Sequence, residues 1–408
     1  MKECKAFDVV INGGSMVGLA LACGLQGTGL RVAVIERQRP LSLQIEEQSK
    51  RKVSVINTAS RRLLQHVQVW QEIAAEYANP YRSLEVWEGD SFGRISFDVT
   101  GMGYSELGHI ITNCIIQQAL WRRAEQLAEV ILIAPTTLRQ VVWGENAAFI
   151  TLDNDHMLTA RLVVAADGAR SWLRSHVDIP LTFWDCQNHA LVATVCTAQP
   201  HSNIARQTFK GDSVLAFFPL SNPHLSSIVW SLPPSVAKEY LKTSTSAFNA
   251  SVAIHSNLTL GLCELQGHRN TFPLTSRYAL NFAAHRLVLL GDAAHTVHSL
   301  AGHDVNLGFM DVAELLGEVR RLQKAGKDIG HYPYLRRYER RRKLSAALML
   351  LRMRGLDELV ATHQPFQRWI RSTGFRLIDT LPSAKQHLLK QMMGLNDAPA
   401  WLSAEECD

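Results

Sequence analysis

The sequence predicts an α/β protein in which buried parallel strands form one domain, a mostly antiparallel sheet forms a second, and helices end the chain. Three observations lead to this prediction. Asp8–Gly18 is an apolar strand that runs into a glycine turn, and an apolar helix follows at once. Two later continuous apolar runs, over 162–166 and 287–290, are typical of parallel strands buried on both faces. The stretch 181–275 instead alternates short strand-like runs with turns.

The strand, glycine turn and helix indicate a Rossmann-type unit, in which a dinucleotide pyrophosphate lies on the N-terminus of the helix. Gly13 and Gly18 occupy the first and last glycine positions of the motif, and Gly14 lies between them. Ser15 occupies the middle position, where the backbone must approach the pyrophosphate closely. The second strand ends at Glu36, 23 positions after Gly13, where a carboxylate can accept hydrogen bonds from ribose hydroxyls.

The composition is that of an ordinary globular protein. A chain of 408 residues with 47% hydrophobic and 19% charged residues is long and apolar enough for two domains. The net charge of +5 permits attraction to anionic membranes or cofactors, and no basic groove with interleaved aromatic residues indicates nucleic-acid binding. The seven cysteines lack metal-ligand spacing and a disulfide framework, so we expect free thiols and no metal.

The hydropathy pattern indicates neither a signal peptide nor a membrane-spanning segment. The N-terminus runs almost at once into the first strand, without the apolar core of a signal peptide. No apolar run reaches the roughly 20 residues that cross a bilayer. We therefore expect a cytoplasmic protein that at most lies on the inner face of the membrane.

The remaining segments divide the chain. Strand-like runs are expected at 53–57, 190–197, 214–220, 226–232 and 267–274, and a hairpin at 81–97 with its turn at 88–90. Helical patterns are expected at 59–69, at 113–127 and from 335 onward. These patterns predict a first domain from 1–80, 105–180 and 276–345, a second from 81–104 and 181–275, and a C-terminal helical segment, 346–408.

Three separated motifs carry a resemblance to a known family. They are the glycine turn with Glu36, the segment Asp167–Arg174 (DGARSWLR), and the segment from Gly291 to Asn306, which begins GDAAH. In this order they resemble the single-component FAD-dependent aromatic hydroxylases of the para-hydroxybenzoate hydroxylase type, over nearly the whole chain. Four shorter phrases are similar to the ubiquinone-biosynthesis branch of that family: RSLEVW at 82–87, FPLT at 272–275, VNLGFMD at 305–311 and GLND at 394–397.

The resemblance implies an FAD-binding Rossmann-type domain roofed by an antiparallel-sheet substrate domain. It implies hydroxylation of a polyprenylphenol with O2 and a reductant such as NAD(P)H, with contacts to a ubiquinone-biosynthesis complex and the membrane surface. The chemistry in this class belongs to the flavin, and the protein excludes water and orients the ring. No side-chain nucleophile is required, and no Ser/His/Asp or metal constellation is found.

The resemblance also assigns site residues. Asp292 would accept hydrogen bonds from the ribityl chain, although Asp also suits a helix N-cap. The helix after Gly302 would direct its positive end at the flavin ring. The implied cofactor-binding residues are Gly13, Gly14, Ser15, Gly18, Glu36, Arg37, Lys52, Gln117, Asp167, Gly168, Asp292, Gly302, His303, Asp304, Val305 and Asn306. The implied substrate-pocket residues, for an apolar tunnel, are Phe217, Phe218, Trp230 and Ser299, whereas His295 and His298 are interpreted as structural.

Four of these positions depart from the family's pattern. Ser15 and Asp304 stand where the family has glycine, Ser299 where it has proline, and Lys52 where relatives tend to have arginine. Asp304 brings a negative charge toward a ring that becomes anionic on reduction. Two like charges ~4 Å apart at an effective dielectric constant of 20 repel by roughly 4 kcal/mol. We therefore hypothesise that this chain binds FAD weakly or has impaired hydroxylation.

Two further questions stay open at the level of sequence. The basic residues within 336–343 spread around a helix. They are interpreted either as a solvated face or as a binding surface for an anionic lipid or an acidic partner. Two alternatives to polyprenylphenol hydroxylation remain: a catalytically silent relative within a quinone-biosynthesis complex, and a hydroxylase of a small soluble aromatic. Bound flavin and O2 consumption would distinguish an active hydroxylase from the silent relative. A closed polar pocket would indicate a small soluble aromatic substrate, whereas a long apolar tunnel would indicate a polyprenylphenol.

Overall fold

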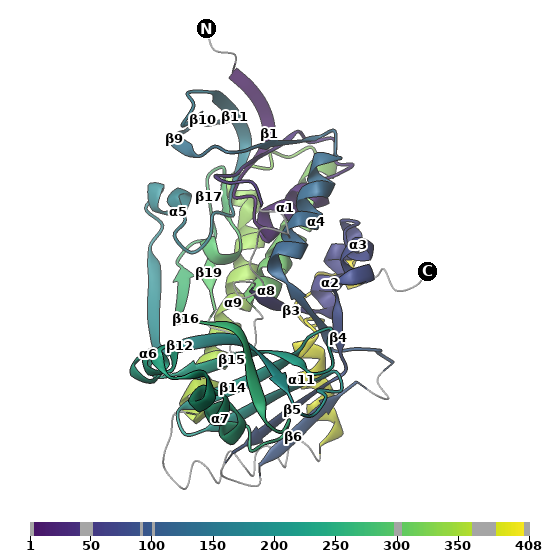
Figure 1. Ribbon diagram of the computed structural model, residues 1–408. Coiled ribbons are helices and arrows are strands. Elements are labelled where there is room, and N and C mark those ends of the chain that lie inside the picture. The colour runs from purple at the N-terminus through teal and green to yellow at the C-terminus, as the bar shows by residue number, and fades with distance from the viewer. Residues whose placement is uncertain are drawn as a thin grey trace.

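Two large sheets, one above the other in Figure 1, form the body of the molecule, with long helices beside and between them. This computed structural model describes residues 4–40, 52–89, 93–99, 103–297, 304–360 and 381–403. The upper sheet is mainly parallel, the lower one mainly antiparallel, and a small three-stranded sheet lies at their junction. The predicted α/β class with an antiparallel second sheet and C-terminal helices is confirmed.

The upper sheet has the strand order β17-β18-β11-β1-β2-β8. Its parallel strands are β1 (Cys4–Asn12), β2 (Val32–Ile35), β8 (Val130–Ile133), β11 (Met157–Ala165) and β18 (Leu287–Leu289). Its antiparallel strands are β17 (Ala283–Ala284), β9 (Leu138–Trp143) and β10 (Ala148–Leu152). The three apolar runs that the sequence singles out are thus neighbours, because β11 pairs with β1 on one side and with β18 on the other.

Three helices pack together beside the upper sheet: α1 (Met16–Gly24), α4 (Asn113–Glu125) and α8 (Asp304–Lys324). Helix α1 contacts both of the others, which explains why its residues from Gly18 onward are buried. A Cβ at Gly24 would lie 2.4 Å from a methyl carbon of Leu316, so glycine permits α1 and α8 to approach closely. The long helix α9 (Tyr332–Val360) packs on the same α8.

The lower sheet has the strand order β19-β16-β12-β15-β14-β13-β5-β6. Its neighbours are antiparallel except β13 and β5, which are parallel. The strands are β5 (Ser83–Glu88), β6 (Arg94–Asp98), β12 (Leu181–Thr197), β13 (Ile204–Lys210), β14 (Ser213–Pro219), β15 (Leu225–Leu232), β16 (Cys263–Ala279) and β19 (His295–Thr296). One face packs against α6 (Pro234–Lys242) and α7 (Thr245–His255).

The other face of the lower sheet packs against the small sheet and the C-terminal helix α11 (Pro382–Met392). The small sheet consists of β3 (Val53–Asn57), β4 (Asn79–Tyr81) and β7 (Gly108–Thr112). The shorter helices are α2 (Thr58–His66), α3 (Trp70–Glu76), α5 (Trp172–His176) and α12 (Ala400–Ser403), and η2 (Gly291–Ala293) is a 3-10 turn. Within the described ranges no helix is both long and apolar enough to cross a bilayer.

The elements differ from the sequence prediction mainly in the lower sheet. The hairpin is confirmed, since Val86 pairs with Ile95 and Leu84 with Phe97, and α4 is confirmed with Ile116 buried. Strands β12 and β16 are each much longer than predicted, β13 was not predicted, and α6 and α7 lie in a stretch interpreted as strand-rich. Helix α7 is short and mostly apolar, so periodicity alone does not distinguish it from a buried strand.

Phe309 offers a test of the packing of α8. Its ring is 0% exposed in the core beside the upper sheet. We expect Phe309→Ala to lower the free energy of unfolding by about 3–5 kcal/mol, because a buried ring leaves a cavity. Phe149→Ala is the matched control: that ring is 46% exposed, and its loss should change the free energy by less than about 0.5 kcal/mol. Equal losses in urea unfolding would contradict this packing.

Candidate cofactor site

The predicted motifs meet at one edge of the upper sheet. Strands β1, β11 and β18 are adjacent and parallel, so the glycine turn after Asn12, the turn at Asp167 and the turn at Gly291 lie at neighbouring strand ends. Asn12 Nδ2 donates to Asp167 Oδ2 at 3.0 Å and ties two of these turns together. The carboxyl edge of an open α/β sheet is where such folds bind ligands.

The glycine turn has no room for side chains at two positions. Gly13 has φ +117°, and a Cβ there would lie 2.2 Å from the carbonyl oxygen of Ala166. A Cβ at Gly18 would lie 2.0 Å from the carbonyl oxygen of Gly13. Ser15 is exposed at the N-cap of α1, and its hydroxyl makes no capping hydrogen bond. The first amide groups of α1 are therefore free of a side-chain cap, which suits a phosphate.

Glu36 and Gln117 both hold the backbone of this turn. Glu36 Oε2 accepts a hydrogen bond from the amide of Gly14 at 2.5 Å, and Gln117 Nε2 donates to the carbonyl oxygen of Gly14 at 2.9 Å. Arg37, the next residue along the chain, is exposed. The structure thus brings these predicted residues together and gives Glu36 a second task, because its carboxylate fixes the turn.

Asp167 is also a structural clamp. Its Oδ2 accepts from the amide of Trp172 at 2.8 Å and that of Leu173 at 3.3 Å, at the start of α5. Its Oδ1 is buried without a partner among the described residues, and Gly168 follows with φ +79°. One carboxylate oxygen is therefore available to a ligand group at this edge, while the other holds the fold.

Two carboxylates, Asp292 and Asp304, face each other electrostatically across the site. Both side chains reach solvent, yet both are surrounded by protein on a wider radius. Burial and the charge of Asp304 raise the pKa of Asp292 to about 6, against the opposing effects of His295, Arg277 and Lys52. Burial raises the pKa of Asp304 also. The surroundings of both side chains therefore disfavour the charged form of each carboxyl.

The N-terminus of α8 is fixed to β3 by Asn306. Asn306 Oδ1 accepts from the amide of Asn57 at 3.0 Å, and its Nδ2 donates to the carbonyl oxygen of Val55 at 2.6 Å. Val305 is buried, and Asp304 begins the helix. The predicted Gly302 and His303, and likewise His298 and Ser299, lie outside the described residues. Asn306 therefore positions the helix through its side chain.

Lys52 joins the two sheets. Its Nζ lies 4.5 Å from the ring centre of Phe272 on β16, a cation–π contact between the residue before β3 and the lower sheet. Phe272 pairs with Ala190, whose neighbour Leu191 points to the opposite face. The Phe272 face of the lower sheet is thus the face that looks toward the cofactor-site residues.

This register changes the interpretation of three predicted pocket residues. Trp230 pairs with Leu191 and packs with Phe217 in the core against α6 and α7, and its ring stacks on Tyr240 with 4.9 Å between centres. Both buried rings point away from the face that carries Phe272, so they are packing residues. Phe218 has the opposite orientation and packs toward the small sheet. Strand periodicity places Phe217 and Phe218 on opposite faces, and the sequence does not say which face is which.

Sequence reasoning missed two residues that hold the turn carrying Asp292. Arg174 Nη1 donates to the carbonyl oxygen of Ala293 at 2.8 Å, and Asp311 accepts from the amide of Gly291 at 2.9 Å and from His295 Nε2 at 2.7 Å. Both lie inside motifs that the sequence singles out, DGARSWLR and VNLGFMD. The signal available in the sequence was a charged residue inside each motif.

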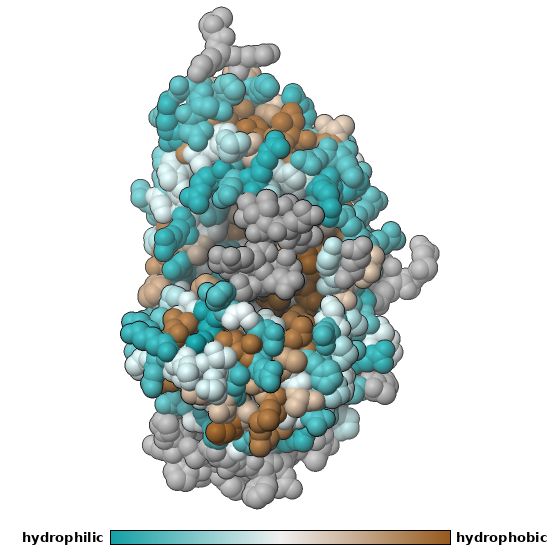
Figure 2. Space-filling view, viewed as in Figure 1, coloured by the Kyte–Doolittle hydropathy of each residue, from teal (hydrophilic) through white to brown (hydrophobic). Residues whose placement is uncertain are grey.

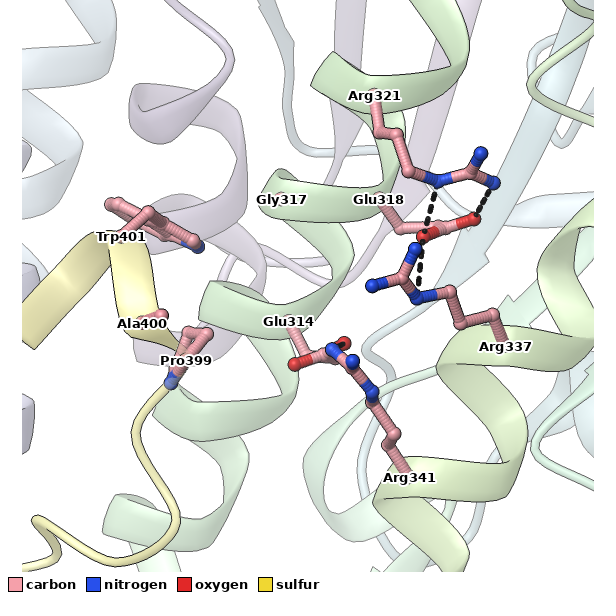
Figure 3. A pocket seen from close by; sticks show the side chains of 9 residues that line it. All are labelled: Glu314, Gly317, Glu318, Arg321, Arg337, Arg341, Pro399, Ala400 and Trp401. Carbon is pink, nitrogen blue, oxygen red and sulfur yellow. Dashed lines mark hydrogen bonds and ion pairs between the residues drawn. The ribbon is translucent and has the colours of Figure 1, made fainter.

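The basic residues of α9 have different surroundings and different ion-pair partners. Arg342 is buried, whereas Arg341 pairs with Glu314 at 2.6 Å, and Arg337 lies 3.9 Å from Glu318. Figure 3 shows these pairs beside a hollow of about 230 Å³. The hollow is lined by Glu314, Gly317, Glu318, Arg321, Arg337, Arg341, Pro399, Ala400 and Trp401. It contains none of the predicted cofactor residues.

The fold and this site define a Rossmann-type flavoprotein with an antiparallel sheet over the cofactor edge. A family model described as an FAD binding domain matches residues 6–352. The chain therefore belongs to the FAD-binding-domain family, whose members include FAD-dependent monooxygenases.

Characterised relatives extend this similarity over the whole chain. It is 33% identical to the 3-demethoxyubiquinol 3-hydroxylase of Escherichia coli over 95% of this chain and 98% of the relative. It is 30% identical to the ubiquinone hydroxylase UbiL of Rhodospirillum rubrum, over 96% and 90%. The structure is similar to that of PqsL, a probable FAD-dependent monooxygenase from Pseudomonas aeruginosa, with a TM-score of 0.76, 20% identity and coverage of 91% and 99%. This last similarity concerns the fold.

The residues present fit FAD. The cradle at Gly13 and Gly18 excludes any Cβ, the N-terminus of α1 is free of a side-chain cap, and the carboxylate of Asp292 is accessible on the same edge. Asp304 is a described residue that departs from the family's pattern, and we expect its carboxylate to oppose the negative charge of a reduced flavin. The cofactor is FAD.

The raised pKa of Asp292 predicts how stability changes with pH. A carboxyl whose pKa is raised from 3.8 to about 6 takes up a proton on folding between those values. Its contribution to the free energy of unfolding is therefore full below about pH 4 and is lost as the pH rises through 6. We expect the FAD-free wild-type protein to lose stability relative to Asp292→Asn as the pH rises from 4 to 7 in urea unfolding. A difference independent of pH would contradict the raised pKa.

The two glycine departures predict a gain of affinity. We expect the double variant Ser15→Gly, Asp304→Gly to lower the Kd for FAD about tenfold, which is ~1.4 kcal/mol. The first change frees the approach to the pyrophosphate, and the second removes a charge from the flavin edge. Ser244→Gly is the matched control, since Ser244 caps α7 far from this edge and should leave the Kd unchanged. An unchanged Kd in the double variant, measured by flavin fluorescence, would exclude this account.

Proposed function

We propose that this chain is an FAD-dependent monooxygenase that hydroxylates the ring of a polyprenylated phenol in ubiquinone biosynthesis, with O2 and NAD(P)H. The observation that supports the proposal is the meeting of the glycine cradle, Asp292 and the N-terminus of α8 at one sheet edge. Relatives named as ubiquinone-biosynthesis hydroxylases, similar over nearly their whole length, support the substrate class.

In this proposal each group has a distinct task. The turn at Gly13–Gly18 and the first amides of α1 hold the pyrophosphate, Glu36 the adenosine ribose, and Asp292 the ribityl chain. When bound, the flavin supplies the oxidation of NAD(P)H and the activation of O2 for ring hydroxylation. The N-terminus of α8 places the positive end of a helix toward the ring. The lower sheet covers the site and keeps water from it.

The substrate ring would lie under the face of the lower sheet that carries Phe272 and Phe218. Figure 2 shows hydrophobic side chains gathered over the lower sheet on the visible face and in the recess between the two halves of the molecule. Lys52 bridges the halves at Phe272. An apolar surface beside the cofactor edge suits a phenol with a long hydrocarbon chain better than a small polar aromatic.

Contact with a membrane surface is part of the proposal. On α9 the side chains of Leu344, Leu348 and Leu351 are 62%, 41% and 67% exposed, and their spacing places them on one side of the helix. Arg340 and Arg354 are exposed at the two ends of this leucine row. Exposed leucines between arginines suit the interface of an anionic bilayer, where a polyprenylated substrate resides.

The first experiment is the visible spectrum of the purified protein before and after addition of FAD. We expect a bound-flavin spectrum and consumption of NADPH and O2 on addition of a short-chain polyprenylphenol in detergent, with one oxygen atom from labelled O2 in the product. Unprenylated phenol should be at least tenfold slower. A protein that takes up no FAD would support the silent scaffold, and equal rates with unprenylated phenol would support the small-aromatic alternative.

The same assay measures the ring position. The sequence phrases resemble the bacterial 2-octaprenylphenol hydroxylases, whereas the E. coli relative is named for hydroxylation at position 3 of a demethoxyubiquinol. Both share the fold and cofactor, so the position is set by how the lower sheet seats the ring. Mass spectrometry of the product with each phenol assigns it.

A further inference from the structure

A chain of ion pairs, buried at Arg342 and Asp311 and half-buried at Asp397, joins the C-terminal segment to the turn that carries Asp292. The carboxylate of Asp397 accepts from Arg342 Nη1 through both oxygens, each at 3.0 Å. Arg342 Nε donates to Asp311 Oδ1 at 2.6 Å. The side chains of Arg342 and Asp311 are 2% and 0% exposed, and Ser345 donates to the same Asp397. Asp397 is thus the outer end of a continuous ionic path.

The inner end of this path lies on both sides of Asp292. Asp311 Oδ2 accepts from the amide of Gly291, one residue before Asp292, and from the ring of His295, three residues after it. Although burial opposes it, His295 and Arg342 lower the pKa of Asp311 below its ordinary value, so this carboxylate stays charged. A single buried carboxylate therefore fixes the two ends of the turn that presents Asp292.

The C-terminal segment is itself anchored to the other wall of the site. The amide of Ala59 donates to the carbonyl oxygen of Met393 at 3.0 Å. A Cβ on Gly394 would lie 2.5 Å from Asn57 Nδ2, and the amide of Asn57 is the donor to Asn306 at the start of α8. Residues 393–397 therefore touch the supports of both the Asp292 turn and the N-terminus of α8.

Helix α12 fixes the far end of the segment. Trp401 Nε1 donates to the carbonyl oxygen of Ala313 at 3.2 Å, and a Cβ on Gly317 would lie 3.0 Å from the same Nε1. Figure 3 shows Trp401 lying against α8 beside Gly317, next to the pairs formed by Glu314 and Glu318. With both ends held, Asp397 cannot move away from Arg342 without a change in the segment.

Loss of one charge in this path leaves another uncompensated. Arg342 is buried between two carboxylates, and removal of one leaves it dependent on Asp311 alone. A buried ion with an incomplete set of partners is costly, and the remaining groups shift to satisfy it. Since Asp311 also accepts hydrogen bonds from Gly291 and His295, that shift reaches the Asp292 turn.

We propose that Asp397 is a positioning residue for the cofactor site, acting through Arg342 and Asp311 on the Gly291–His295 turn, so that the C-terminal segment sets FAD affinity. The proposal rests on the proposed function, in which Asp292 contacts FAD. It assigns to the end of the chain a task in the site more than a hundred residues before it.

The test compares Asp397→Asn with Glu318→Gln in the full-length protein. Glu318 is a buried carboxylate on the same helix as Asp311 that pairs with Arg321 and Arg337 and does not contact Asp311. We expect Asp397→Asn to raise the Kd for FAD about tenfold, a typical size for coupling between separate sites. Glu318→Gln should lower the melting temperature without changing the Kd. Asp397→Glu should restore most of the affinity.

Hydrogen exchange of the FAD-free protein gives a second, cofactor-independent measurement. Asp397→Asn should accelerate exchange in the peptide 287–297, and Glu318→Gln should not. Unchanged exchange there, or equal acceleration in both variants, would overturn the inference whether or not FAD binds. Wild-type protein that takes up no FAD would contradict the proposed function alone, whereas intact wild-type binding with equal Kd in all variants would contradict this inference alone.

Discussion

The parallel pairing of β11 with β1 and β18 is the constraint on which the site depends. It brings residues that are about 280 positions apart, Gly13 and Asp292, to one sheet edge. The closest approach is between backbones: neither Gly13 nor Gly18 has room for a Cβ. The cradle is therefore a consequence of how tightly the strand ends meet, and α1, α8 and the Asp167 clamp hold that arrangement from three sides.

Electrostatics then decides how well the cradle serves a flavin. The parts that resemble the family, namely the helix N-termini and Asp292, which we propose to contact the ribityl chain, are present in the fold. Burial and the charge of Asp304 raise the pKa of Asp292, and we expect the same charge to oppose a reduced flavin. Arg277 on β16 of the lower sheet and Lys52, directly before β3, lower the pKa of Asp292 and so act against this effect. We expect the relation between these four groups to set how tightly the chain holds FAD and its reduced form.

The ionic path from Asp397 through Arg342 to Asp311 connects the C-terminal segment to the turn around Asp292. Asp311 is fully buried and accepts hydrogen bonds from three donors, two of which lie on the turn around Asp292. A buried ionic group gives little net stability but strongly penalises displacement. The C-terminal segment, which folds back onto β3 and α8, thereby becomes part of the scaffold of a site formed mostly by the first half of the chain and α8.

The sequence by itself determined the strand–turn–helix unit, the neighbouring buried strands, helix α4, the hairpin and the family, because these follow from local periodicity, glycine spacing and contiguous motifs. Only the tertiary structure decided which face of the lower sheet looks toward the site. Alternation separates Phe217 from Phe218 but assigns neither to a face, since that choice depends on α6 and α7 covering one side. It also decided the partners of Arg342 and Asp311: the sequence shows a charge, and only packing shows that it is buried and what surrounds it.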